Sequence, residues 1–332
     1  MRGLVLGRDG PSRGEARLVR LGGCASWVFA ATLAVPSLLQ AAPLPDVPRL
    51  SREMSGGESQ YEVRAGDSLA LIGARHGQSP RLIARDNAIG PGKALKPGLA
   101  LSIVNRHLAA EPVEPVEPVE QGIVINVPQR MLFLYVNGRL DGAWPIAAGR
   151  PDWPTPLGAF KVASKQRDKT WIVPKSIQQE MQREGKPVLT SVPPGPDNPL
   201  GRHWIGLSLD SLGIHGTIAP ASIYDLRSHG CIRMHPDDVA QLYVRVQVGA
   251  PGTIVYRPAL LGLMPDGRIF AEVHRDAYRR APAPFVVLRE IADREGLSDR
   301  IDWGRVAALA REQDGIAREV GLPPRPAGDP ER

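Results

Sequence analysis

The chain has 332 residues, of which 42% are hydrophobic, so it is long enough for one to three folded domains with their own cores. Its 35 glycines and 33 prolines favour turns and short strands and argue against a helical bundle. The formal net charge of +6 is small, and the Lys and Arg residues form no block, so we expect no nucleic-acid partner.

The N-terminal residues 1–42 have the layout of an export signal. Five arginines precede the apolar run 21–39, and small residues follow it. We expect cleavage near Ala41 or Ala42. An uncleaved membrane anchor is the alternative, because the run is nearly long enough to span a bilayer. Cleavage would remove Cys24 and leave a single cysteine, which cannot form an internal disulfide.

Two segments are predicted to lack regular structure. Residues 43–59 are polar and rich in Pro, Ser, Gly and charge, which predicts a disordered lead-in. Residues 106–121 contain the repeat EPVEPVEPVE, in which proline at every third position favours an extended rod. We interpret 106–121 as a spacer between two domains, with a binding site for another protein as the alternative.

Between these segments, residues 60–105 predict a small α/β unit. An alternating strand is followed by a turn, and Asp67 or Ser68 then caps a helix. Pro80 fits the first position of a second helix, and residues 99–104 form a closing strand. The expected order is strand–helix–helix–strand.

Residues 122–257 predict a mainly β domain. Asn137-Gly138 marks a hairpin turn, and a single clear helix begins at Pro236 and ends at Gly249. Many short strands with one or two helices indicate a β-sandwich or small barrel. Strands are expected at residues 123–127, 131–136, 144–147, 158–162, 204–207, 212–215 and 253–256.

Residues 258–332 form a C-terminal extension whose pattern indicates no function. Residues 268–273 are expected to be an edge strand after a turn. The spacing from 284 to 320 is largely helical, and the last dozen residues are expected to be unstructured.

The stretch 228–233, with the sequence SHGCIR, carries the strongest functional signal. A thiolate is a strong nucleophile, and an imidazole can take the proton of Cys231. His215 is the candidate base if the loop that follows it folds back toward the cysteine. Gly230 lets backbone N–H groups point at a developing oxyanion. The planar guanidinium of Arg233 suits a carboxylate.

Other interpretations of these residues remain open. An isolated cysteine can be buried and inert, although the polar neighbours of Cys231 argue against that. A zinc hydrolase is a different class of enzyme, but the spacing matches no common zinc-ligand pattern, so we expect no metal. The five residues from which such a site would be drawn are His203, His215, His229, Cys231 and His235.

The stretch 228–233 and the motif His215-Gly216-Thr217 together resemble the catalytic motifs of the YkuD-type L,D-transpeptidases. Residues 155–158 and 198–201 match that family as well, and the resemblance covers about residues 122–257. Residues 60–105 resemble a LysM domain, a module that binds the glycan of peptidoglycan or chitin. An ErfK-like order of signal, LysM module and catalytic domain extends the resemblance over most of the chain. It implies a mainly β catalytic domain and a small α/β LysM module, whereas the spacer and the C-terminal extension are not part of the resemblance. The helical C-terminal tail is expected from residue spacing alone.

The resemblance also implies roles for the motif residues. Cys231 attacks the carbonyl of the meso-diaminopimelate residue in a peptidoglycan stem peptide, and the terminal D-alanine leaves. His215 carries the proton, and the N–H groups of Gly230 and Cys231 hold the oxyanion. The substrate-binding residues would be Arg233, Ser228, His229 and Thr217, with Ser228 and His229 also shaping the loop.

The implied partners are peptidoglycan stem peptides and glycan in the periplasm, and no cofactor is implied. The acceptor that resolves the thioester is a second stem peptide, a lysine of an outer-membrane lipoprotein, or water. An L,D-carboxypeptidase or endopeptidase that trims the same stems is one alternative. A non-catalytic peptidoglycan-binding protein is the other.

Overall fold

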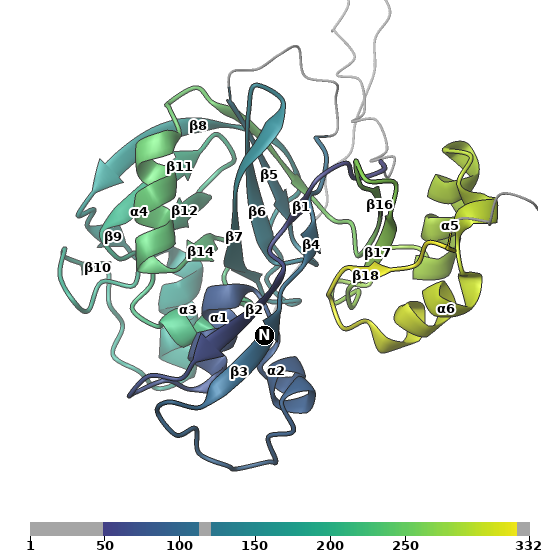
Figure 1. Ribbon diagram of the computed structural model, residues 1–332. Helices are drawn as coiled ribbons and strands as arrows, with labels where there is room; N and C mark the ends of the chain where they lie inside the picture. The colour runs from purple at the N-terminus through teal and green to yellow at the C-terminus, as the bar shows by residue number, and fades with distance from the viewer. Residues whose placement is uncertain (1–48, 113–120, 324–332) are drawn as a thin grey trace, which may run out of the picture. The chain divides into compact units, whose positions relative to one another are not determined.

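A computed structural model describes residues 49–112 and 121–323 (Figure 1). The predicted export signal and the last residues of the chain lie outside this range, as do residues 113–120 of the predicted spacer. Within the range, no helix combines the length and the apolar character needed to cross a membrane.

The N-terminal module, residues 49–112, contains the predicted strand–helix–helix–strand order. The two strands pair antiparallel around a small core of aliphatic side chains that includes Ile72 and Ile83. The hydroxyl of Ser68 accepts a hydrogen bond from the N–H of Leu71 at 3.2 Å, so Ser68 is the cap of the first helix. The elements are β2 (Glu58–Glu62), α1 (Leu69–His76), α2 (Pro80–Asp86) and β3 (Ala100–Val104).

The expectation of a disordered lead-in is wrong for residues 49–59, and the spacer interpretation is wrong for residues 106–112. β1 (Met54–Ser55) pairs with β4 (His107–Leu108), and the N–H of Ser51 donates to the carbonyl of Leu261 at 2.8 Å. Leu50 is buried in the core of the C-terminal module. The polar composition suggested disorder, but partners distant in the sequence supply the hydrogen bonds that order these residues.

The central domain, residues 121–257, is built on one sheet. Among the described residues its strands follow the order β13-β7-β14-β12-β11-β8-β15-β5-β6, and an additional pairing of β6 with β7 gives the sheet a barrel-like closure. The strands are β5 (Gln121–Asn126), β6 (Met131–Val136), β7 (Arg139–Gly149), β8 (Gly158–Arg167), β11 (His203–Leu207), β12 (Gly213–His215), β13 (Leu226–Ser228), β14 (Ile232–Met234) and β15 (Pro251–Val255).

Local sequence signals account for several features of this domain. Asn137 and Gly138 both have positive φ, 51° and 73°, as the tight turn between β6 and β7 requires. Helix α4 (Pro236–Arg245) begins at the predicted proline and packs on β11, burying Val239 and Leu242. It ends before the expected Gly249, because the chain turns into an extended conformation at Val246.

The C-terminal module, residues 258–323, is a three-stranded sheet covered by two helices (Figure 1). The sheet order is β16-β17-β18, so the prediction that 268–273 is an edge strand is wrong: the short β18 returns to pair with its open side. The elements are β16 (Ala259–Leu263), β17 (Ile269–Val273), α5 (Pro284–Arg294), α6 (Trp303–Glu312) and β18 (Arg318–Glu319).

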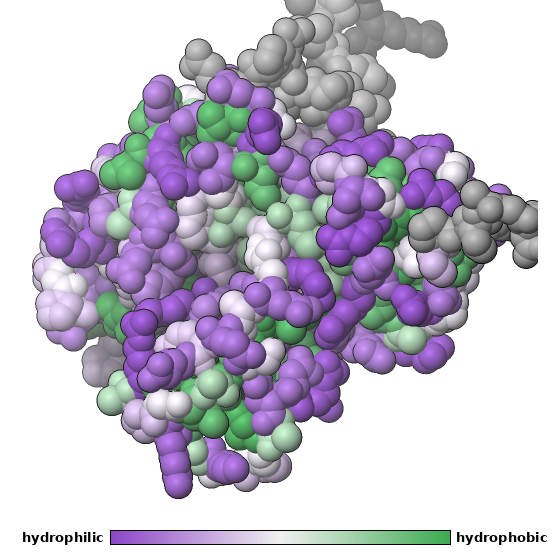
Figure 2. Space-filling model, viewed as in Figure 1, coloured by the Kyte–Doolittle hydropathy of each residue, from purple (hydrophilic) through white to green (hydrophobic). Residues whose placement is uncertain are grey.

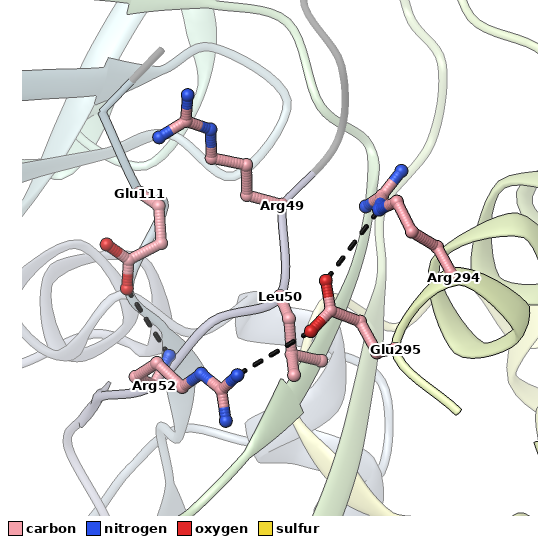
Figure 3. Close-up of a pocket in the computed structure, with 6 residues that line it drawn as sticks. All are labelled: Arg49, Leu50, Arg52, Glu111, Arg294 and Glu295. Carbon is pink, nitrogen blue, oxygen red and sulfur yellow. Dashed lines mark hydrogen bonds and ion pairs between the residues drawn. The ribbon is translucent and has the colours of Figure 1, made fainter. Parts of the chain in front are cut away.

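Polar contacts join the N-terminal and C-terminal modules at the surface. The guanidinium of Arg52 lies 3.6 Å from the carboxylate of Glu295 in the C-terminal module. The backbone N–H of Arg52 donates to Glu111, within the N-terminal module, at 3.3 Å (Figure 3). The face seen in Figure 2 is mostly hydrophilic. Exposed hydrophobic side chains such as Ile172 and Val244 belong to different elements, and single exposed residues of this kind are normal on soluble proteins.

Candidate active site

Cys231 lies directly before β14, which pairs in parallel with β12. The register sets Ile214 opposite Ile232 and His215 opposite Arg233. Because side chains alternate along a strand, Cys231, Arg233 and His215 project from one face of the sheet. A strand spacing of about 4.8 Å and a rise of about 3.3 Å per residue put the Cα atoms of Cys231 and His215 roughly 8 Å apart. Neighbouring strands therefore bring the cysteine and the histidine together.

The orientation of the His215 ring suits it to accept a proton. Its Nδ1 lies 2.7 Å from the carbonyl oxygen of Gly216, which can only accept, so the proton of the neutral ring is on Nδ1. Nε2 is then left as the acceptor. The ring is 4% exposed and stacks on the indole of Trp204, with 5.7 Å between centroids.

Trp204 was not identified from the sequence as a site residue. It sits on β11 directly opposite His215. A Cβ on Gly213 would lie 2.4 Å from the Trp204 ring, so glycine is required for the ring to lie over this strand. Only the strand register reveals this arrangement.

Burial keeps both reacting groups neutral. It lowers the pKa of His215 to about 4, and the charge of Arg233 acts in the same direction. Burial also raises the pKa of the Cys231 thiol, against the opposing effects of the Gly213 backbone and Arg233. The thiol is half-buried, and its Sγ donates to the carbonyl of Ser211 at 3.7 Å. The resting pair is therefore a thiol beside a neutral imidazole, and the proton must move as the sulfur attacks.

This electrostatic state predicts an unusual pH dependence. We expect kcat/KM to decline on the acid side only near pH 4, because His215 remains neutral above that value. Alkylation of Cys231 by iodoacetamide should keep accelerating beyond pH 9, since the thiol pKa is raised from 9.0. Intact mass measured across the pH range gives the rate. A plateau below about pH 8 would instead reveal a thiolate already formed in the free protein.

Arg233 is prepared to bind an anion. Its guanidinium is half-buried, and among the described residues its Nε has no hydrogen-bond partner. Burial lowers the pKa of Arg233, because partial removal of the guanidinium from water disfavours its charged form. A buried donor without a partner is uncommon, and a carboxylate would satisfy it with two parallel hydrogen bonds.

Gly230 does not have the free N–H group that the oxyanion role requires. Its N–H donates to the Ser228 hydroxyl at 3.1 Å, and its carbonyl accepts from the Thr155 hydroxyl at 2.8 Å. The predicted oxyanion donor at Gly230 is thus corrected, because both of its backbone groups hold the loop. Of the two predicted N–H groups, that of Cys231 remains the candidate.

The Ser228 and Thr217 side chains are also positioned for structure and not for substrate. Ser228 is fully buried, and its hydroxyl donates to the carbonyl of Cys231 at 2.5 Å. Thr217 is buried, and its hydroxyl accepts from the N–H of Ala219 at 3.0 Å. Their predicted substrate contacts are corrected, because each hydroxyl is used within its own loop.

His229 connects the cysteine loop to a helix that sequence analysis missed. Its Nε2 lies 2.5 Å from the carboxylate of Glu180 on α3 (Lys175–Arg183). Arg150 donates to the other oxygen of Glu180 at 2.6 Å, and Trp153 packs its ring edge-on against His229. This helix has no buried residue, which is why hydrophobic periodicity did not reveal it.

Helix α3 belongs to an excursion between β8 and β11 that also contains β9 (Trp171–Ile172) and β10 (Ser191–Val192). Asn198 holds the base of the excursion. Its buried amide donates to the carbonyls of Lys169, Val192 and Pro193, and its oxygen accepts from the N–H of Leu200 at 3.0 Å. The sequence motif that contains Asn198 therefore has a structural purpose.

Replacing Asn198 by alanine should loosen the excursion. Removal of these part-buried hydrogen bonds costs about 0.5–1.5 kcal/mol for each bond lost. We expect faster limited proteolysis between residues 168 and 197 and a raised KM, with kcat less affected. Asp197→Ala, which removes an exposed neighbour, is the matched control. Equal protease resistance in the two variants would contradict this role.

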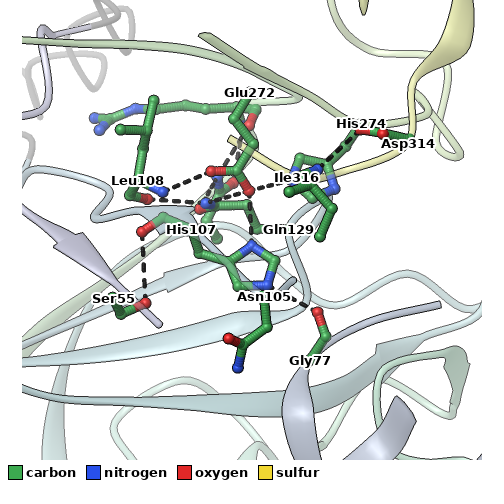
Figure 4. A network of polar contacts seen from close by, with 12 residues as sticks. Ser55, Gly77, Asn105, His107, Leu108, Gln129, Glu272, His274, Asp314 and Ile316 are labelled. Atoms are coloured by element: carbon green, nitrogen blue, oxygen red, sulfur yellow. Dashed lines mark hydrogen bonds and ion pairs between the residues drawn. The ribbon is translucent and has the colours of Figure 1, made fainter. Parts of the chain in front are cut away.

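The five residues of the zinc alternative do not gather. Among the described residues, the donor atoms that do cluster belong to His107, Glu272 and His274, all buried (Figure 4). Glu272 accepts hydrogen bonds from both rings, from the amide of Gln129 and from the N–H of Leu108, at 2.6–3.0 Å. These bonds make the cluster a hydrogen-bonded junction between distant segments of the chain.

Comparison with known proteins identifies the family. A model of the L,D-transpeptidase catalytic domain (YkuD) matches residues 120–255. The probable L,D-transpeptidase YcfS of Escherichia coli strain K12 is 30% identical over 259 residues, covering 75% of this chain and 77% of that protein. The chain belongs to the L,D-transpeptidase family.

Other members of the L,D-transpeptidase family match a smaller share of this chain. The probable L,D-transpeptidase ErfK/SrfK of Salmonella typhimurium is 32% identical over 208 residues, covering 59% of this chain and 66% of that protein. The solved catalytic domain of the Enterococcus faecium L,D-transpeptidase is 24% identical, with a TM-score of 0.33, and the match covers 42% of this chain and all of that one. The catalytic domain of this L,D-transpeptidase is that of an acyltransferase.

Proposed function

We propose that this protein is a periplasmic peptidoglycan L,D-transpeptidase with Cys231 as its nucleophile. The observation that carries the proposal is the common face on which β12 and β14 present His215, Cys231 and Arg233. A histidine base whose Nδ1 is bonded to the Gly216 carbonyl, a thiol, and a guanidinium whose Nε has no partner are groups suited to acyl transfer from a carboxylate-bearing peptide. The names of the relatives support the reaction class.

In the first half-reaction, the Cys231 sulfur attacks the carbonyl carbon of the diaminopimelate residue while His215 Nε2 takes the thiol proton. The carbonyl becomes an oxyanion, for which the N–H of Cys231 is the candidate donor. The oxyanion then collapses and the peptide C–N bond breaks. His215 passes its proton to the leaving amine of D-alanine, and a thioester on Cys231 remains.

In the second half-reaction, an acceptor amine attacks the thioester and gives its proton to His215. The C–S bond breaks, the proton returns to the sulfur, and a new amide bond is formed. A second stem peptide as acceptor gives a 3-3 cross-link, and a lipoprotein lysine gives an anchored protein. Water as acceptor gives carboxypeptidase trimming. Arg233 is the group we assign to a carboxylate of the stem peptide.

The proposal is tested with a defined disaccharide-tetrapeptide substrate. We expect release of D-alanine and formation of a dimer linked between two diaminopimelate residues, both read by mass spectrometry. Accumulation of tripeptide without dimer would favour trimming. Absence of D-alanine release together with retained binding to peptidoglycan would support the non-catalytic alternative, in which residues 60–105 act as a LysM-like glycan-binding module.

A further inference from the structure

One tyrosine of the C-terminal module is hydrogen-bonded to the turn that supports the cysteine loop. Tyr278 follows β17, and its hydroxyl donates to the carbonyl of Gly149 at 2.6 Å. The same hydroxyl accepts from the backbone N–H of Thr155 at 3.2 Å. One phenol therefore bridges the start and the end of the turn 149–155 that follows β7.

That turn is the support of the nucleophile. The hydroxyl of Thr155 accepts from the N–H of Gly149 and donates to the carbonyl of Gly230, each at 2.8 Å. Gly230 precedes Cys231 and has a φ of +103°, a conformation that needs to be held by its surroundings. A continuous path of hydrogen bonds thus runs from Tyr278 through Thr155 to the residue next to the thiol.

Tyr278 itself is held by Tyr256, at the end of the preceding domain, and by residues of its own module. Its ring stacks on Tyr256 with centroids 5.1 Å apart, and its N–H donates to the Tyr256 hydroxyl at 2.7 Å. The Tyr256 hydroxyl in turn donates to Asp276, which also accepts from the backbone N–H groups of Arg280 and Ala281. The segment that carries Tyr278 is therefore tied down on both sides of the ring.

A second contact from the same module supports the other arm of the loop. Tyr224 lies between His215 and Cys231, is buried, and has a φ of +64°. The Arg130 guanidinium lies 4.2 Å from the centre of its ring, and a Cβ on Gly315 of the C-terminal module would lie 3.6 Å from its hydroxyl oxygen. The C-terminal module therefore approaches Tyr224 in the middle of this loop, in addition to the bonds of Tyr278 to the turn that holds Gly230.

We propose that the C-terminal module is part of the catalytic unit and that Tyr278 is a positioning residue for Cys231. It acts through Thr155 and Gly230, and it touches neither the substrate nor the sulfur. The module, for which the sequence indicated no function, fixes the backbone from which the thiol and the Cys231 N–H project. The inference names a residue that positions the nucleophile of the proposed function. It depends on the proposed function only in those experiments that measure turnover.

The test compares Tyr278→Phe with Tyr243→Phe in the full chain. Tyr243 lies on α4, and its substitution is the matched control. Loss of the hydroxyl should lower kcat by about 10-fold to 100-fold, since misplacement of a reacting group by about 1 Å has effects of this size. KM should stay within about twofold, and the iodoacetamide alkylation rate of Cys231 should change by at least about threefold.

The pair Thr155→Val and Thr155→Ser makes the test independent of Tyr278. Valine removes the hydroxyl and should reproduce the Tyr278→Phe defect, whereas serine retains the hydroxyl and should restore most of kcat. The Tyr278→Phe/Thr155→Val double variant should be little worse than either single variant, because both act along one path.

The outcomes separate this inference from the proposed function. If the parent protein releases D-alanine and Tyr278→Phe leaves both kcat and the alkylation rate at the parent values, the positioning role is wrong. Additive losses in the double variant would also overturn it. If the parent releases no D-alanine, the proposed function fails, and the alkylation rates of the five variants still decide whether Tyr278 positions the thiol.

Discussion

Replacing Cys231 by serine should lower D-alanine release by at least about 10⁴-fold. The hydroxyl has nearly the shape of the thiol but holds its proton far more tightly. The neutral His215 ring, whose pKa is lowered to about 4, is too weak a base to remove that proton. The expected loss is therefore one of chemistry, with substrate affinity retained, and it is measured as D-alanine formed from the tetrapeptide.

The only other cysteine provides the matched control for this substitution. Cys24→Ser should leave turnover unchanged, because Cys24 belongs to the predicted export signal. Thermal unfolding of Cys231→Ser should occur within a few degrees of the parent. Measurable turnover by this variant at even a hundredth of the parent rate would show that another group is the nucleophile.

Replacing Glu272 by glutamine should have the largest effect on stability. The carboxylate is fully buried and accepts four hydrogen bonds from His107, Gln129, His274 and Leu108. The other ring nitrogen of His107 lies 2.8 Å from the carbonyl of Gly77, so the ring is held at both ends. Glutamine would place an NH₂ group among these donors and leave one of them without an acceptor.

Loss of the carboxylate from this buried network costs about 3–5 kcal/mol of unfolding free energy, which corresponds to a fall in Tm of about 10 °C or more. Glu58→Gln is the matched control, because Glu58 pairs with Arg106 at the surface and such pairs contribute less than about 1 kcal/mol. Differential scanning calorimetry of the two variants makes the comparison. Equal Tm values for the two variants would show that the Glu272 carboxylate does not stabilise the fold more than the surface carboxylate of Glu58 does.

Glu272 also predicts how the parent protein responds to acid. Burial by itself would raise the Glu272 pKa, but the two histidine rings hold it at about 2. As the pH falls, Glu272 is therefore protonated first in the unfolded chain, where its pKa has the ordinary value of 4.5, and only near pH 2 in the folded chain. The contribution of Glu272 to stability should be complete above about pH 5 and should disappear as the pH falls toward 2. In Glu272→Gln this part of the acid dependence should be absent.

Local features of the fold could be predicted from the sequence because their causes are local. Ser68 caps a helix, Asn137-Gly138 closes a hairpin and Pro236 starts α4, each through the chemistry of one or two residues. The pairing of Cys231 with His215 could be expected from motif spacing. The strand register that brings them together could not, because it depends on the whole sheet.

The corrections share one physical origin. The Gly230 N–H and the Ser228 hydroxyl were expected to face a substrate, and they satisfy each other. Helix α3 has no buried residue, and residues 49–55 have no pattern of their own, so both depend on partners elsewhere in the chain. Tyr278 lies far along the sequence from the loop it supports. Contacts of this kind are decided by which partner a group finds in the folded chain.

The pairing of Ser51 with the strand β16 affects the order in which parts of the protein can fold during synthesis. The first described residues complete a sheet that is otherwise made by the end of the chain. During synthesis these early residues must wait, without their hydrogen-bond partners, until nearly all of the polypeptide has been made. The core around Ile72 and Ile83 comes from one continuous stretch of chain, whereas this edge of the sheet can be completed only after β16 has been synthesised.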